Sequence, residues 1–181
     1  MNVRRLDPSV AALFASIDRS EHVEVQYRVE GGNARVEAPV TMADIPTWDP
    51  EGSGEYSVAS YIAFSASVIA DGAVLLGAFD DDGQLVGLAT VHSTFEPGLA
   101  WLATLHVSQV SRRRGAASAL WDAAAALAHD AGAQHLYVSA TPTGSAVGFY
   151  LGRGCRLADR VYPKLFALEP EDTHLVCELN A

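Results

Sequence analysis

Three consecutive arginines followed by small residues form the segment of this chain best suited to bind an anion. They stand in the stretch LHVSQVSRRRGAASALW, which places Arg112, Arg113 and Arg114 directly before Gly115, Ala116 and Ala117. The first N–H groups of a helix lack intrahelical acceptors, and the helix dipole adds partial positive charge there. Gly115 lets a phosphate approach the backbone, and arginine side chains pair with phosphate oxygens. The pattern therefore predicts a phosphate site at a helix start.

Two familiar phosphate motifs are missing from this turn. No GxxxxGK[ST] segment occurs, and the single glycine cannot form a GxGxxG dinucleotide turn. The alternative interpretation of the same residues is an arginine-rich helix start on a solvated face, and the local sequence leaves both interpretations open.

The first half of the chain is expected to supply strands and helices that flank this turn. Helical spacing, period-2 alternation and Gly/Pro clusters distinguish the elements. The patterns predict a helix at 8–17, a hairpin turning at Gly31-Gly32, a substrate-facing loop at 41–55, a helix at 56–72, and two strands within 73–95 around the turn Asp80 to Gly83.

The second half is expected to contain the centre of the sheet. The apolar run LAWLATLHVS indicates a central strand buried on both faces. The remaining patterns predict a helix from Gly115 to Ala131, a buried strand HLYVSA at 135–140, a short helix stopped at Gly152–Gly154, and a last strand from His174 to Leu179. The chain is therefore expected to be one mixed α/β domain, 1–181, whose sheet is antiparallel in its first half.

Composition excludes several classes of protein. The formal net charge of −10 argues against nucleic-acid binding and favours a cationic amine over an anion as ligand. No apolar run reaches about 20 residues and no signal-peptide core follows the N-terminus, so we expect no membrane span and a cytoplasmic protein. Cys155 and Cys177 form no CxxC pair, which argues against a disulfide framework or a zinc site and favours core packing in a reducing cytosol.

The arginine turn resembles the acetyl-CoA signature of GCN5-related N-acetyltransferases. In that family an R/Q-x-x-G-x-G/A segment follows a strand; Arg112, Gly115 and Ala117 match it, while Arg113 stands where glycine is common. A second block, His135 to Arg156, resembles the family's strand, turn and A-x-x-F-Y helix. The resemblance is clear over about residues 74–179. The opening IDRSEHVEVQYRVEGG and the ending LFALEPEDTHLVCEL are similar to a bacterial branch, and streptothricin-type acetyltransferases are distantly similar.

This resemblance implies the fold and the binding of acetyl-CoA without a metal. The family has a mixed, partly splayed sheet flanked by helices, and its pantetheine arm inserts between two parallel strands. Here main-chain groups of Leu105, His106 and Val107 would hold that arm, and an N–H near Val107 would polarise the thioester. The implied contacts to coenzyme A are those residues together with Arg112, Arg113, Arg114, Gly115, Ala116, Ala117, Ser118, Thr141 and Phe149.

The resemblance also implies an acid, whereas the base stays open. Tyr150 matches the family's general acid, and a phenol can protonate the departing thiolate; the alternative is a core aromatic beside Phe149. Glu96, before Pro97-Gly98, is one candidate base, and His92 and His106 are others, although strand histidines are more often packed residues.

Two other groups of residues have structural alternatives to a site. Trp48 and Asp49 lie in the loop where an acceptor could bind, and a tryptophan that caps the core is the alternative. Asp80, Asp81 and Asp82 form an exposed turn and lack the spacing of a calcium loop.

The sequence thus predicts an N-acetyltransferase that moves acetyl from acetyl-CoA to a small-molecule primary amine in a ternary complex. Relatives are often dimers, so a homodimer is an open expectation. Three alternatives remain: a non-catalytic acyl-CoA sensor on the same fold, an enzyme acting on protein N-termini or lysines, and a nucleotide-binding regulator that uses the arginine turn.

Overall fold

A seven-stranded mixed sheet organises the molecule. The computed structural model describes residues 1–31, 33–35, 44–54 and 56–179. The strand order is β1-β4-β5-β6-β7-β9-β8, and only β6 and β7 pair in parallel; every other neighbouring pair is antiparallel. The strands are β1 (Asn2–Arg5), β4 (Val74–Phe79), β5 (Leu85–Glu96), β6 (Leu99–Val107), β7 (His135–Ala140), β8 (Arg156–Leu157) and β9 (Thr173–Glu178).

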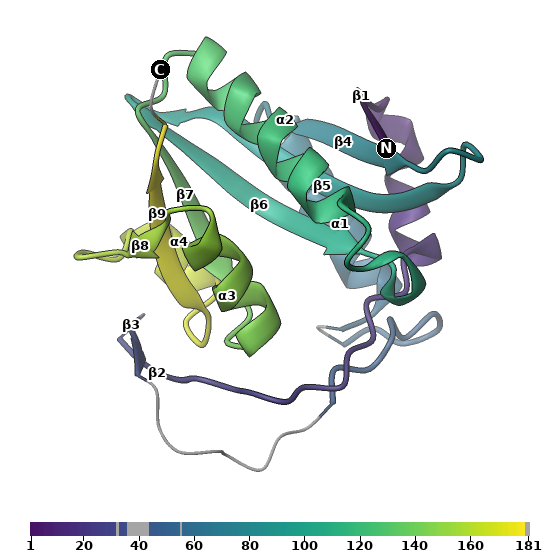
Figure 1. Cartoon of the computed structure of the whole chain (residues 1–181), viewed down its shortest axis with the longest axis horizontal. Helices are drawn as coiled ribbons and strands as arrows, with labels where there is room; N and C mark the ends of the chain where they lie inside the picture. Colours follow the sequence, from purple (N-terminus) through teal and green to yellow (C-terminus); the bar gives the residue numbers. More distant parts are fainter. Residues whose placement is uncertain (32, 36–43, 55, 180–181) are drawn as a thin grey trace.

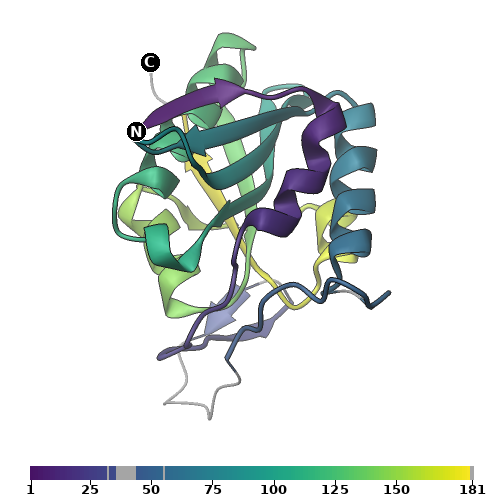
Figure 2. The same ribbon diagram turned by 90° about the vertical axis from the view of Figure 1, so that its right-hand side faces the viewer.

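Helices cover both faces of this sheet (Figures 1 and 2). On one face, the Ala-rich helix α2 packs Leu120, Trp121 and Ala124 into the main core. On the other face, Figure 2 shows η1 and α1 side by side. Phe14 of η1 and Ile17, which directly follows η1, pack against Leu75 and Leu88. The helical elements are η1 (Pro8–Ser16), α1 (Val58–Ala70), η2 (Gln109–Ser111), α2 (Ala116–Asp130), α3 (Gly144–Gly152) and α4 (Pro163–Leu168).

Local capping explains where the helices around the site begin and end. The side chain of Ser57 accepts a hydrogen bond from Ser60 N at the start of α1, and Thr143 does the same for Ala146 N at the start of α3. Helix α2 ends before Gly132, whose φ of +86° is a left-handed conformation that glycine adopts without strain. These caps fix the ends of the helices that carry candidate site residues.

Most of the predicted elements are confirmed, with two differences of detail. The predicted helix at 8–17 is a 3₁₀ helix, and within the described residues the predicted hairpin is the short antiparallel pair β2 (Arg28–Glu30) and β3 (Asn33–Arg35). Residues 32 and 36–40 of the predicted hairpin lie outside the described residues. Part of the expected loop at 41–55, namely 41–43 and 55, lies outside the described residues. Strand β8 and helix α4 lie in a stretch for which the sequence patterns indicated no element.

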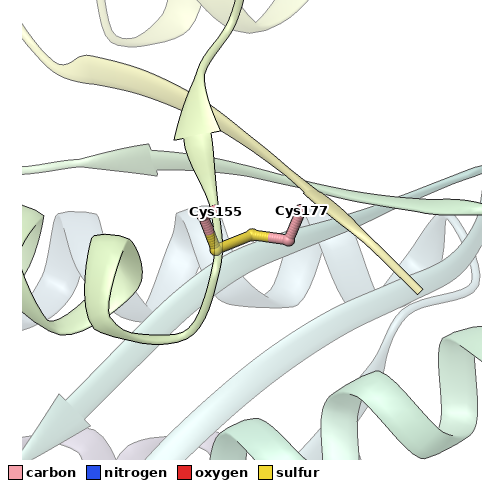
Figure 3. The surroundings of a disulfide bond; sticks show 2 residues. All are labelled: Cys155 and Cys177. Atoms are coloured by element: carbon pink, nitrogen blue, oxygen red, sulfur yellow. A yellow bond between two sulfur atoms is a disulfide. The ribbon is translucent and has the colours of Figure 1, made fainter. Parts of the chain in front are cut away.

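The expectation about the cysteines is wrong, because Cys155 and Cys177 form a disulfide (Figure 3). Strand β8 pairs antiparallel with β9, and the register aligns Arg156 with Val176. The residue before Arg156 therefore faces the residue after Val176, and these two residues are the cysteines. Both are buried, as expected, but the inference of a reducing compartment from unpaired cysteines does not hold.

Among the helices that the structure describes, none is both long and apolar enough to cross a bilayer.

Candidate functional site

The arginine turn joins the end of β6 to the start of α2. Gly115 has a φ of +89°, and among the described residues no atom beyond its two chain neighbours lies within 4 Å of where a Cβ would stand. The first helical bond of α2 runs from Ala119 N to Gly115 O, so the N–H groups before Ala119 have no acceptor within the helix. Arg113, with a φ of +61°, and Arg114 are exposed. This geometry suits a phosphate group.

Arg112 differs from its two neighbours because its side chain binds the protein itself. Its Nε donates to Val107 O at 3.3 Å, and Nη2 donates to Arg19 O at 2.8 Å. Its Nη1 lies 3.4 Å from Glu21 Oε2. Of the three arginines, the exposed pair Arg113 and Arg114 is therefore free to meet a phosphate, whereas Arg112 holds the turn against the N-terminal segment.

Strands β6 and β7 separate next to this turn, as the splayed sheet requires. Their parallel pairing runs from Leu99↔His135 to Leu102↔Val138, and the last residues of β6 have no partner on β7. Ser108 N donates to Val86 O on the β5 side. Because main-chain N–H groups alternate along a strand, those of Leu105 and Val107 point to the side where β7 has left the sheet. These groups are available to an extended ligand.

A segment that we call the strap, residues 18–27, joins the two sides of this separation (Figure 1). At one end, Gln109 N donates to Asp18 O at 2.9 Å, next to the end of β6. At the other end, Tyr27 N donates to Pro142 O at 2.8 Å, in the turn between β7 and α3. Glu21 contacts both sides, since its carboxylate accepts a hydrogen bond from Ser145 Oγ and pairs with Arg112. The strap therefore fixes the spacing of the arginine turn and α3.

Tyr150 lies on α3 with its ring in the main core. It contacts Trp121 at 5.6 Å and Phe149 at 5.2 Å between ring centroids. Burial raises the pKa of its phenol, and the negative charges of Asp172 and Glu169 raise it further. Tyr150 therefore carries its proton at neutral pH, which a proton donor requires.

The other predicted contacts to coenzyme A lie around α2 and α3. Phe149 is half-buried and packs against Trp121 across the two helices, with ring centroids 6.4 Å apart. Thr141 is exposed at the end of β7, and Ser118 is half-buried in the first turn of α2. Helices α2 and α3 therefore lie on the same face of the sheet, with Ser118 on the β6 side of the opening and Thr141, Phe149 and Tyr150 on the β7 side.

On the opposite face, His106 belongs to an aromatic cluster that sequence patterns did not predict. Its Nε2 lies 2.5 Å from the hydroxyl of Tyr61 on α1. Trp48 contacts both rings, with its ring centroid 4.3 Å from that of Tyr61 and 5.5 Å from that of His106. Burial, followed by the charges of Arg19 and Arg112, lowers the pKa of His106 to about 3. The imidazole is therefore neutral at physiological pH.

The two interpretations of Trp48 are compatible in this cluster. Its side chain is 5% exposed, so it closes the core. It also lies beside His106, in the part of β6 from 103 to 107 that does not pair with β7 and that we call the open half of β6. Asp49 is exposed and caps a local turn by accepting from Gly52 N at 2.8 Å. Tyr61 and Arg19 gave no sequence signal, because a tyrosine within an apolar helix and an arginine in a polar segment are both ordinary.

Glu96 and His92 are not brought together with these residues. Glu96 lies at the turn before Leu99, about 26 Å along β6 from Val107. It accepts a hydrogen bond from Tyr162 Oη at 2.6 Å, and this bond, followed by Lys164, lowers the pKa of its carboxyl. His92 Nε2 lies 2.8 Å from Asp71 O in the core. Both residues have structural roles at the other end of the strand.

The aspartate turn is a capped hairpin loop. Asp80 accepts hydrogen bonds from Asp82 N at 3.1 Å and Gln84 N at 2.8 Å. Within the described part of the chain, no three His, Cys, Asp or Glu side chains converge in a way that would hold a metal ion.

Comparisons with known proteins add the family context. Residues 41–154 match the model of the acetyltransferase (GNAT) family. Nourseothricin acetyltransferase is similar in structure, with a TM-score of 0.71, 20% identity and coverage of 99% of this chain and 98% of that chain. PaiA N-acetyltransferase from Thermoplasma acidophilum, solved with coenzyme A, has a TM-score of 0.61, 15% identity and coverage of 98% of each chain.

A more distant structure shares the core alone. Tetrahymena GCN5 has a TM-score of 0.53 and 14% identity, with coverage of 66% of this chain and 75% of that chain. A search of curated protein sequences finds no match. At these identities the solved structures show a common fold.

Proposed function

Since the chain belongs to the acetyltransferase (GNAT) family, we propose that it moves the acetyl group of acetyl-CoA directly to a primary amine of a small molecule. The chain is an acetyl-CoA-dependent N-acetyltransferase by this membership. The observation that carries the proposal is the separation of β6 from β7 beside the open helix-start turn at Gly115. This separation leaves main-chain groups of β6 next to the proposed phosphate site.

The residues present fit coenzyme A. The N–H groups from Gly115 to Ser118, which have no acceptor within α2, would donate hydrogen bonds to its diphosphate, and Arg113 and Arg114 would add positive charge. Main-chain groups of Leu105 and Val107 would pair with the pantetheine arm, since both face the open side of β6. Thr141 and Phe149 would line the opposite wall.

The chemistry follows from this arrangement. The neutral amine attacks the thioester carbonyl, an N–C bond forms, the C–S bond breaks, and the amine loses a proton. The N–H of Val107 would stabilise the negative charge that develops on the carbonyl oxygen. Tyr150 would give its proton to the departing thiolate, because burial keeps its phenol protonated. Cys155 and Cys177 are joined to each other, which supports direct transfer over a cysteine-bound acetyl group.

The proton of the amine needs another route than Glu96, which lies too far along β6 to take it. His106 is closer, but a group with a pKa of about 3 is a weak base. We propose that the proton leaves to water, and that the pair of His106 and Tyr61 orients the amine on the open half of the strand.

The experiment is an acetylation screen that separates small amines from peptides. Purified protein, acetyl-CoA and either an amine library or peptides with free N-termini and lysines are incubated, and products are identified by their mass. The proposal predicts one added acetyl group on a small amine and none on peptides; the opposite pattern would favour a protein acetyltransferase. Acetyl-CoA binding without any turnover would favour an acyl-CoA sensor.

The role of Tyr150 is tested in the same assay. Tyr150→Phe should lower kcat by about a hundredfold or more while acetyl-CoA affinity stays unchanged. Tyr27→Phe, at a half-buried tyrosine on the strap, is the matched control. An unchanged kcat in Tyr150→Phe would make Tyr150 a core aromatic.

A further inference from the structure

The side chain of Arg19 is stacked on two aromatic rings near strand β6. Its Cζ lies 4.3 Å from the centroid of Trp48 and 5.2 Å from that of Tyr56. The carbonyl oxygen of Arg19 accepts a hydrogen bond from Arg112 at 2.8 Å, so the main chain is fixed as well. The guanidinium is therefore held in a defined place and plane at the start of the strap.

This guanidinium has no acid partner among the described residues. By contrast, Arg112 pairs with Glu21, Arg153 with Asp122 and Arg156 with Asp159. Within the same described part of the chain, no carboxylate lies within ion-pair distance of Arg19 and no acceptor meets its N–H groups. The charge of Asp172 acts electrostatically on Arg19. Partial burial of an unpaired cation costs free energy, and a ligand anion would offset this cost.

Trp48, the ring on which Arg19 is stacked, also contacts the open half of β6. Trp48, on which Arg19 lies, is 5.5 Å from the ring of His106 and 4.3 Å from that of Tyr61. The indole N–H of Trp48 is buried and has no acceptor among the described residues. The ring of Trp48 therefore lies between Arg19 and β6, the strand beside which the amine would be acetylated.

We propose that Arg19 binds a carboxylate of the acceptor, and hence that the acceptor is an amine that also carries a carboxylate, such as an amino acid. The inference rests on the proposed acetyl transfer to a small amine. A guanidinium presents parallel N–H groups that match the two oxygens of a carboxylate, and stacking on Trp48 and Tyr56 holds that fork in position.

The overall charge of −10 works against a carboxylate at long range. At physiological salt such repulsion is screened beyond about 8 Å, so the nearest charges decide. Arg19 and Arg112 are the two cations whose charges act on His106. An acceptor carboxylate at Arg19 would thus meet local positive charge inside an acidic protein. The competing explanation is that Arg19 only covers the Trp48 ring with its aliphatic stem.

The experiment compares each of the twenty protein amino acids with its carboxamide and its decarboxylated amine as acceptors. Release of the coenzyme A thiol is measured in wild type, Arg19→Met and Arg19→Lys. Arg4→Met is the matched control, because Arg4 also stacks on a ring, at 3.9 Å from Phe79, but lies exposed on β1. We expect kcat/KM of at least one amino acid to exceed that of its carboxamide by roughly tenfold or more, as one charge-assisted hydrogen bond allows.

In Arg19→Met that preference should disappear through a higher KM, Arg19→Lys should keep part of it, and Arg4→Met should match wild type. Equal or better turnover of the carboxamides, or an unchanged preference in Arg19→Met, overturns the proposal. So does the absence of any saturable shift of the Trp48 indole N–H signal in NMR titrations with the amino acids, assigned with Trp48→Phe. If no amine of any kind is acetylated although acetyl-CoA binds, the proposed transferase function fails instead.

Discussion

The Nε2 of His106 lies 2.5 Å from the hydroxyl of Tyr61, and this contact joins the open half of β6 to helix α1. The two residues are 45 positions apart in the sequence and meet because α1 packs on the face of the sheet to which His106 points. Tyr61 also contacts Trp48. The acceptor side of the proposed site is thus built from three separate segments of the chain.

Protonation of His106 should oppose folding. Burial, followed by the charges of Arg19 and Arg112, lowers its pKa from 6.5 to about 3. The unfolded chain binds the proton with the ordinary pKa, so between these values it holds more protons than the folded chain, and the free energy of unfolding falls as pH falls. His106→Asn should therefore lose less of this free energy than wild type from about pH 7.5 to about pH 5 in denaturant titrations. His129→Asn, on an exposed part of α2, is the control; an equal fall in wild type and His106→Asn would contradict the assignment.

The protein should be more stable with glycine than with alanine at position 113. Its φ of +61° makes it the one described non-glycine residue in the left-handed region, and this conformation costs a residue with a Cβ about 1 kcal/mol or more. Arg113→Gly should thus exceed Arg113→Ala by about 1 kcal/mol in free energy of unfolding. At Arg114 the order should reverse, because glycine gains nothing there. The same order at both positions would show that Arg113 is not strained.

The charges of the arginine run should have separable effects. Arg112→Ala removes three contacts with the strap and the end of β6, so it should lower the free energy of unfolding by about 2 kcal/mol. Arg114→Ala should leave stability within about 0.5 kcal/mol of wild type, since its side chain is exposed. Arg114→Ala should instead weaken acetyl-CoA binding, and this effect should be largest at low salt because salt screens the attraction between exposed charges. A stable Arg112→Ala variant would mean that the strap is held by other contacts.

The disulfide should stabilise the region that follows α3. It closes a loop with a sequence separation of 22 residues, for which loss of chain entropy in the unfolded state predicts about 3 kcal/mol. The double variant Cys155→Ser, Cys177→Ser should unfold at correspondingly lower denaturant, and reducing agent should shift wild type but not the variant. Wild-type stability that is unaffected by reducing agent, with two free thiols by mass, would contradict the bond.

How far the sequence predicts this molecule depends on how local the determining interactions are. The strand, arginine turn and helix from Leu99 to Asp130 follow from apolar runs, an Ala-rich helix and glycine ends, and they were predicted correctly. The cysteine pair was missed because it depends on the register of β8 and β9, which no local pattern encodes. Arg112 shows a third case: its place in the turn was predicted, whereas its inward contacts with the strap depend on tertiary packing.

The aromatic cluster was beyond sequence analysis for a similar reason. Arg19, Trp48, Tyr61 and His106 come from the strap, a loop, a helix and a strand, and only the packing of η1 and α1 on the sheet brings them together. Glu96 illustrates the converse. Its position before a central strand suggested a base, but a long strand separates it from the arginine turn.

The central claim is that the turn at Gly115 holds coenzyme A, and calorimetric titration with acetyl-CoA tests it most directly. Wild type should bind acetyl-CoA at micromolar concentration, and Gly115→Glu should lower the affinity by at least about tenfold, because its carboxylate would stand where the diphosphate is proposed to bind. Gly132→Glu is the matched control, since Gly132 has a φ of +86° and equally open surroundings at the other end of α2. Binding lost in Gly115→Glu and retained in Gly132→Glu is the predicted result. A folded wild-type protein that does not bind acetyl-CoA, or one whose binding survives Gly115→Glu, would contradict the account.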